Sequence, residues 1–203
     1  MSFYRKEGGV YDLSKKLTLG IPSGEDFIGD KDIDDRLYSY MLLHSSKGLE
    51  KEARLFHKTK LRGAYKDIGI NYRTMLKRLD HLVGGGYIIE FKDIYELSVK
   101  GCKYKKYIYR DTLSRLYSTG EKDIIKLYIY LSSLYTQYKT AAYFTYNSLV
   151  GVLGYSSYKN NRKRKDIKRL LETLREMKLI NYVINTKEQR FAKFRVIKIG
   201  EVI

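Results

Sequence analysis

Apolar residues recur at helical spacing along two stretches of the chain, and each stretch predicts the same order of elements. In the first stretch, the pattern predicts a helix over Asp34 to Ser45 and a weaker one over Thr59 to Asp67 that ends at Gly69. Asn71 is a favourable N-cap for a third helix. The residues that this third helix turns toward a core are Met75, Leu79 and Leu82.

Two short β-rich segments follow the third helix. The helix ends at Gly84-Gly85-Gly86, and the segments Tyr87 to Phe91 and Ile94 to Ser98 are separated only by Lys92-Asp93, which is typical of a hairpin. Helix, helix, turn, helix, hairpin is the order of a winged helix. We therefore interpret the first stretch as a winged-helix domain.

The second stretch begins with a predicted strand and a well-marked helix. Lys105 to Arg110 has the composition of a strand. Ser118, with Glu121 three residues later, predicts a capping box before a helix over Ile124 to Tyr138. These elements repeat the opening of a winged helix.

The rest of the second stretch completes the same pattern. Thr145 is a candidate N-cap for a short helix that ends at Gly154. A long helix follows, with an apolar stripe of Ile167, Leu170, Leu171, Leu174 and Met177. The segments Tyr182 to Ile184 and Phe191 to Ile199 then predict a second hairpin.

The two stretches also share a motif. Gly29-Asp30-Lys31-Asp32-Ile33 recurs as Gly120-Glu121-Lys122-Asp123-Ile124. The sequence therefore predicts an α+β protein with two tandem winged-helix (helix-turn-helix) domains related by internal duplication. Their expected bounds are 17–103 and 104–203, after an N-terminal extension over 1–16. No linker rich in Pro, Ser or Gly separates them, so we expect the domains to pack closely.

The charge of the chain indicates a polyanionic partner. The formal net charge is +17, and it is unevenly distributed. Residues 1–100 carry 18 basic and 15 acidic groups, whereas residues 101–203 carry 22 and 8. The second domain should therefore contribute most of the electrostatic attraction to double-stranded DNA.

Basic residues cluster at the start of the long helix, on the side opposite its apolar stripe. The run Arg162 to Lys165 opposes the helix dipole, which favours acidic groups in the first turn. A DNA phosphate backbone would relieve this conflict, and the N-terminal part of a recognition helix meets base edges in the major groove. Arg73 and Lys77 occupy matching positions in the first domain. The predicted DNA-binding residues are Arg73, Lys77, Tyr158, Lys159, Asn161, Arg162, Lys163, Arg164, Lys165, Lys168, Arg169, Lys187, Arg190 and Lys193.

Both groups of basic residues have simpler explanations. The charged face of the long helix could be merely solvated. Arg73 and Lys77 could form ordinary surface pairs with Asp80 and its neighbours. In a chain with 21 tyrosines, packing or capping explains Tyr158 better than a DNA contact does.

Other classes of function find little support in the sequence. Cys102 is the only cysteine, so neither an intrachain disulfide nor a cysteine-based zinc cluster can form. No His-x-His pair, phosphate-binding loop or dinucleotide fingerprint is present, and helix capping explains the acidic residues at 25–32 better than a nuclease metal site. We therefore expect no enzyme activity, cofactor or metal. The lack of a signal sequence and of a membrane span indicates a cytoplasmic protein.

The chain resembles the plasmid and phage replication initiators built from two winged-helix domains. The resemblance extends over about Leu17 to Ile199. Its local matches are Tyr107-Ile108-Tyr109, Lys126-Leu127-Tyr128-Ile129-Tyr130-Leu131 and Leu174-Arg175-Glu176-Met177-Lys178-Leu179-Ile180. It implies binding to directly repeated origin sites, contact with host helicase or initiator proteins, and a possible homodimer. The alternatives are a winged-helix transcriptional or partition regulator and a helicase-loader type adaptor.

Overall fold

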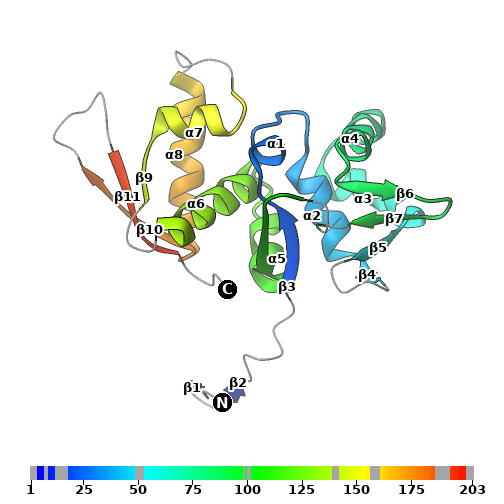
Figure 1. Ribbon diagram of the computed structural model, residues 1–203, viewed down its shortest axis with the longest axis horizontal. Helices are drawn as coiled ribbons and strands as arrows, with labels where there is room; N and C mark the ends of the chain where they lie inside the picture. Colours follow the sequence, from blue (N-terminus) through cyan, green and yellow to red (C-terminus); the bar gives the residue numbers. More distant parts are fainter. Residues whose placement is uncertain are drawn as a thin grey trace.

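Each half of the chain forms a small antiparallel sheet with helices packed beside it (Figure 1). The computed structural model describes residues 4–6, 9–11, 18–48, 53–97, 99, 102–138, 142–155, 161–185 and 193–199. These residues form a mixed α+β fold. An antiparallel pair, β1 (Tyr4–Lys6) and β2 (Gly9–Tyr11), precedes both halves.

The two halves follow a similar order of elements. The first half consists of β3 (Thr18–Pro22), α1 (Glu25–Ile28), α2 (Asp35–Leu43), β4 (Ser46–Lys47), β5 (Arg54–His57), the 3-10 helix η2 (Lys58–Lys60), α3 (Leu61–Ile68), α4 (Tyr72–Gly84), β6 (Ile88–Glu90) and β7 (Ile94–Leu97). The second half consists of β8 (Lys105–Tyr109), α5 (Arg110–Ser118), α6 (Ile124–Tyr138), β9 (Ala142–Thr145), α7 (Tyr146–Val152), α8 (Asn161–Glu176), β10 (Ile180–Asn185) and β11 (Lys193–Ile199). Apart from β4 and η2, each half runs strand, helix, helix, strand, helix, helix, hairpin.

The sheets also correspond in their pairing. The strand order is β4-β5-β7-β6 in the first half and β10-β11-β9 in the second. In both, the strand that precedes the last two helices pairs antiparallel with the second strand of the hairpin, β5 with β7 and β9 with β11. Both predicted hairpins are therefore confirmed, but each belongs to a larger sheet. β3, β4, β5 and β9 were not predicted from the sequence.

Local capping explains where the helices of the first half begin and end. The Asp34 carboxylate accepts hydrogen bonds from the backbone N–H groups of Arg36 and Leu37, at 2.9 and 3.2 Å, and so caps α2. The predicted cap of α4 is confirmed, since Asn71 Oδ1 accepts from the Thr74 N–H at 2.8 Å. Gly69 ends α3 in the left-handed region, at φ 72°, where a side chain is disfavoured. Met75, Leu79 and Leu82 are all buried, as predicted.

Most of the elements predicted for the second half are confirmed. Thr145 and Ser148 form a capping box at the start of α7. The apolar stripe of α8 is buried from Ile167 to Leu174, and Met177 packs partly buried at its end. The helix over Ile124 to Tyr138 has the predicted bounds.

One predicted cap is wrong. Ser118 does not open a capping box, because it is the last residue of α5, a helix that the sequence analysis did not predict. Its hydroxyl donates to the Ser114 carbonyl at 2.8 Å, within that helix. The Glu121 N–H instead donates to Thr119 Oγ1 at 3.2 Å.

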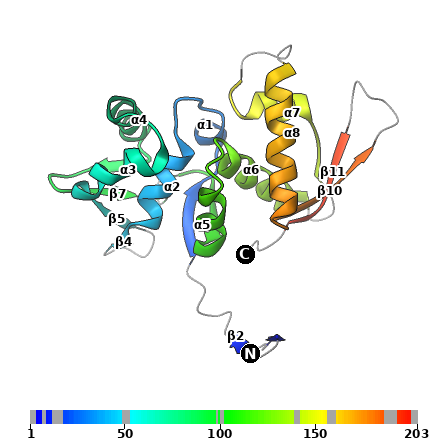
Figure 2. The same ribbon diagram turned by 180° about the vertical axis from the view of Figure 1, so that it is seen from behind.

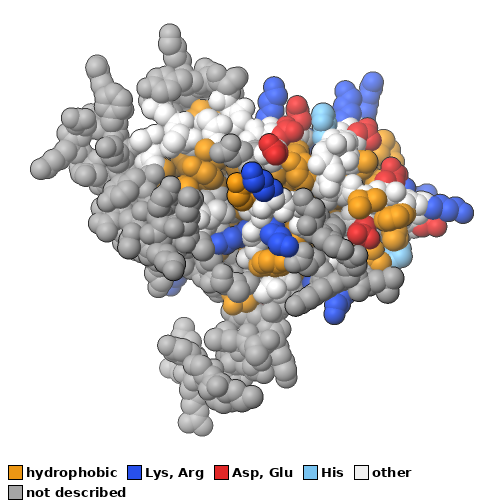
Figure 3. Space-filling model, in the orientation of Figure 1, with side chains coloured by type: hydrophobic (Ala, Val, Ile, Leu, Met, Phe, Trp, Pro, Cys, Tyr) orange, Lys and Arg blue, Asp and Glu red, His pale blue; other side chains and the backbone are white. Residues whose placement is uncertain are grey.

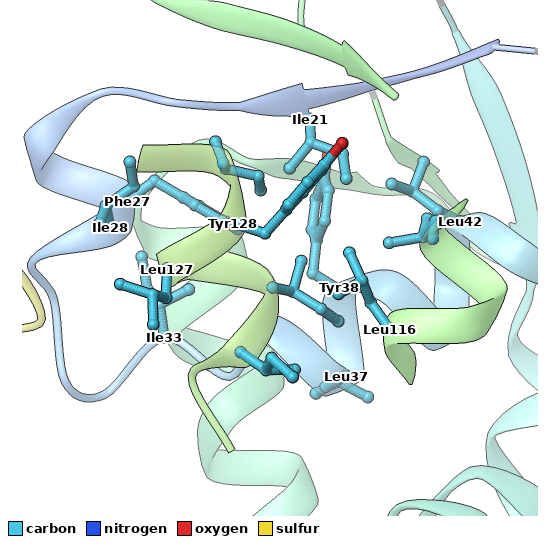
Figure 4. Packing of buried hydrophobic residues seen from close by; sticks show 14 of the residues in the cluster. Ile21, Phe27, Ile28, Ile33, Leu37, Tyr38, Leu42, Leu116, Leu127 and Tyr128 are labelled. Atoms are coloured by element: carbon cyan, nitrogen blue, oxygen red, sulfur yellow. The ribbon is translucent and has the colours of Figure 1, made fainter. Parts of the chain in front are cut away.

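The two halves share one hydrophobic core. β3 pairs antiparallel with β8, with Thr18 opposite Tyr109 and Pro22 opposite Lys105, so a strand from each half forms a sheet between them. Figure 4 shows Phe27, Ile33 and Tyr38 of the first half packed among side chains of α5 and α6 of the second. Burial of this junction stabilises both halves together, as apolar burial generally contributes about 25 cal/mol per Å².

Two arginines of helix α5 bond backbone carbonyls at or just after the ends of other helices, and one of these bonds crosses between the halves. The Arg110 guanidinium donates to the Leu43 carbonyl at the end of α2, at 2.6 Å, and Arg115 donates to the Met177 carbonyl after α8, at 2.7 Å. Cations that bond the last carbonyls of a helix satisfy acceptors that have no partner within it. The two ends joined in this way belong to different halves.

Candidate nucleic-acid interface

Two helices meet at a tight corner in the first half. Gly69, Ile70 and Asn71 connect α3 to α4, and the Ile70 N–H donates to the Tyr65 carbonyl at 3.0 Å. A short glycine-containing connection between two helices is the local arrangement of a helix-turn-helix. In the second half, α7 and α8 take the same places in the order of elements.

The outward side of α4 is both basic and apolar. Arg73 and Lys77 are exposed, as predicted, and neither forms an ion pair with Asp80 or with any other residue in the described part of the chain. Beside them, Tyr72 is 52% exposed and Leu76 is 37% exposed. Figure 3 shows Lys and Arg side chains at the upper edge of the molecule over α4. This surface can therefore attract phosphate groups and also offer apolar contacts.

The outward side of α8 carries three exposed basic residues. Lys165 forms no ion pair with another described residue, whereas Lys168 lies 3.8 Å from Glu172 one turn later. Arg169 forms an ion pair with Glu121, which precedes α6. Exposed pairs of this kind contribute about 0–1 kcal/mol, so an incoming phosphate can compete for both side chains.

The other predicted site residues are described in part or not at all. Lys193 lies on β11, and its side chain is outside the described part of the structure, as are those in the first turn of α8, Asn161, Arg162, Lys163 and Arg164. The predicted residues that fall outside the described residues are Tyr158, Lys159, Lys187 and Arg190.

A buried polar cluster, missed by the sequence analysis, lies between the two halves. Lys126 of α6 is fully buried, and its Nζ donates to the carbonyls of Asp30 and Ile33, at 2.6 and 2.8 Å. The carboxylates of Asp35 and Asp123 are buried beside it. One signal of this cluster was present in the sequence, because Lys126 is the only charged residue in the apolar run from Ile124 to Leu131.

The cluster contains more carboxylates than its single cation can balance. Burial, and next the neighbouring Asp123 carboxylate, raise the pKa of Asp35 to about 6. Asp35 Oδ1 has no hydrogen-bond partner among the described residues. Burial lowers the pKa of Lys126, although Asp35 and Asp123 oppose that shift. The Tyr155 hydroxyl donates to Asp123 Oδ2, and burial followed by this bond raises the tyrosine pKa, so the hydroxyl stays protonated as a donor.

Arg78 connects α4 to the same region. It forms an ion pair with Asp34, the N-cap of α2, whose side chain is only 2% exposed. A charge pair this well buried on one side depends on both partners, because either charge left alone would be costly. Sequence spacing gave no indication of this contact, which joins residues 44 positions apart.

The described residues contain neither a candidate metal site nor a candidate membrane-spanning helix. No group of three or more His, Cys, Asp or Glu side chains among them could hold a metal ion. No helix in the described ranges has the length and apolar character needed to cross a membrane.

The chain was compared with known protein families, curated proteins and solved structures. The chain matches no protein-family model, no curated protein and no solved structure.

Proposed function

We propose that the chain is a sequence-specific double-stranded DNA-binding protein with two winged-helix units related by duplication, and that it initiates plasmid or phage replication without catalysis. In this proposal α4 and α8 enter major grooves, and the second half supplies most of the affinity. The common order of elements, the matching strand pairing and the short connection between α3 and α4 support the winged-helix assignment.

The exposed basic face of α8 carries the proposal. Lys165, Lys168 and Arg169 follow a basic first turn and face away from the buried stripe. The net charge of the chain, +17, attracts any polyanion, but a helix with one buried and one basic face positions that charge for a groove. α4 presents Arg73 and Lys77 in the same manner and would act as the second reader.

A binding assay with matched charge removal tests this proposal. A duplex ligand is first selected from a random pool, and the double variant Lys165→Ala/Lys168→Ala is compared with Lys47→Ala/Lys103→Ala, which removes two exposed lysines outside α4 and α8. We expect the α8 double variant to bind the selected duplex about tenfold or more weakly than wild type, and the control double variant to bind it as wild type does. For the α8 double variant, the plot of log K against log salt should also become shallower by about 2, since each lost phosphate contact removes about 0.9.

Two results would overturn the proposal. One is an equal loss for both double variants, which would mean that only total charge matters. The other is a failure to enrich any duplex sequence at physiological salt over competitor DNA. The initiator role has its own test, because the protein should support replication in trans only of a plasmid that carries its selected sites as direct repeats.

A helicase-loader type adaptor is the second candidate, and one observation favours it. Ile89 lies on the edge strand β6 and Phe91 directly follows that strand, and they are 50% and 47% exposed. Figure 3 shows hydrophobic side chains gathered over β6 and β7. Exposed apolar patches beside polar surface often mark contacts with other proteins. Binding to single proteins of the replication machinery, with no DNA sequence preference, would favour this function.

A further inference from the structure

The α1–α2 loop (residues 29–34) lies between the two halves and contacts both of them. In Figures 1 and 2 this loop stands between α4 on one side and α7 with the turn that follows it on the other. Three separate sets of contacts hold it: the buried ammonium of Lys126, the backbone at Gly154, and the ion pair between Asp34 and Arg78.

Lys126 of α6 holds the loop against the second half. Its ammonium donates to two loop carbonyls, of Asp30 and Ile33, within 2.8 Å. Backbone carbonyls cannot move independently of the chain, so these bonds define where the loop sits on α6. Replacing the bonds with water is not possible without opening the core, because the Lys126 side chain is fully buried.

Gly154 fixes the loop to the turn that leads toward α8. A Cβ added to Gly154 would overlap the carbonyl oxygen of Gly29, and Lys31 N lies 3.3 Å from the same point. The two backbones therefore touch at a place where only glycine fits. Gly154 also has φ 73°, which favours glycine for a second reason. The next residue, Tyr155, bonds Asp123 at the start of α6.

On its other side the loop is connected to α4. Asp34, the last residue of the loop, caps α2 and pairs with Arg78 in the middle of α4. The contacts therefore form a continuous series from α4, through the loop, to Gly154 just after α7, and α7 and α8 bury their apolar residues in the same core.

We propose that the α1–α2 loop is a positioning clamp that holds α4 and α8 in one relative placement, so that the protein reads two DNA half-sites at a single spacing. This inference rests on the proposed DNA-binding function. Gly154, Lys126 and Asp34 are positioning residues, since they act through the helices and do not touch the DNA. The ligand is a duplex with two half-sites whose separation is set by the protein and not by a flexible connection.

The test measures affinity as a function of half-site spacing. The full chain is titrated with duplexes whose selected half-sites are moved apart by one to about five base pairs, up to half a helical turn. We expect wild-type affinity to fall about tenfold for two added base pairs. In Gly154→Ala the added Cβ forces the loop to move. Two added base pairs should then lower the affinity less than about threefold, and the affinity at the best spacing should be below that of the wild type. Gly151→Ala is the matched control, because a Cβ there meets nothing within 4 Å.

Tyr155→Phe provides a second variant if Gly154→Ala does not fold. It removes the hydroxyl that donates to Asp123, keeps the aromatic ring, and should also broaden the spacing profile. A wild-type protein that binds every spacing equally well would overturn the clamp while leaving DNA binding intact. So would a folded Gly154→Ala or Tyr155→Phe protein with the sharp wild-type profile. Failure to select any duplex would overturn the DNA-binding function instead, so the two failures are distinguishable.

Discussion

Neutralising Asp35 should stabilise the protein at neutral pH and leave it unchanged in acid. The side chain is only 1% exposed, one of its carboxylate oxygens has no described partner, and Asp123 is a second carboxylate beside it. The substitution Asp35→Asn keeps the shape of the side chain and removes its charge. Asp123 and Lys126 then remain as a balanced pair.

The expected size of the effect follows from the pKa of Asp35. A rise from 3.8 in the unfolded chain to about 6 in the folded protein corresponds to about 3 kcal/mol. Because the folded pKa is the higher one, this contribution to stability is fully present below pH 3.8 and is lost as the pH rises through about 6. At neutral pH, Asp35→Asn should therefore raise the free energy of unfolding by about 1–3 kcal/mol, the lower values reflecting lost attraction to Lys126.

Urea denaturation followed by far-UV circular dichroism measures this difference, since the chain has no tryptophan. Wild type and variant are compared at about pH 4 and about pH 7.5, on either side of the folded pKa. Asp93→Asn, the same change at an exposed position between β6 and β7, is the control and should alter stability by less than about 0.5 kcal/mol at both values. The reasoning fails if Asp35→Asn destabilises the protein at neutral pH, or if its effect is the same at both pH values.

Two further substitutions test the contacts that hold the fold. Lys126→Met should lower the free energy of unfolding at neutral pH by about 3–5 kcal/mol, because it leaves two buried carboxylates without their cation and two carbonyls without a donor; a loss below about 1 kcal/mol in urea denaturation would contradict the buried bonds. Asn71→Ala removes the cap of α4 and should lower the free energy of unfolding by about 1 kcal/mol at every pH between about 5 and 8, measured in the same way. An unchanged urea midpoint would show that the cap contributes nothing.

The helices were largely predictable because their signals are local. Asn71, Gly69 and Thr145 cap elements through neighbours within a few residues, and the stripe of α8 repeats every turn. β5 and β9 were missed because each is four residues long and gains its stability from pairing with a distant hairpin strand.

The candidate site was predictable on its surface and not in its interior. Exposure of Lys165, Lys168 and Arg169 follows from helical periodicity, since they lie opposite the apolar stripe. The Lys126 cluster does not follow from any local pattern, because its carbonyl partners lie more than 90 residues earlier in the chain. The Ser118 prediction failed for a related reason. A capping motif in sequence cannot show that a preceding helix already occupies its first residue.

The pairing of β3 with β8 has a consequence for how the chain is made. β3 is synthesised before its partner strand β8, which ends at Tyr109. Until β8 has left the ribosome, β3 presents unpaired N–H and C=O groups along an open edge, a surface that invites association with other chains. Contacts between such distant segments also slow folding, because a long loop must close before they form. The first half therefore cannot finish folding before β8 has been synthesised. During that interval the nascent chain avoids association with other chains only if β8 follows quickly or a chaperone covers the open edge.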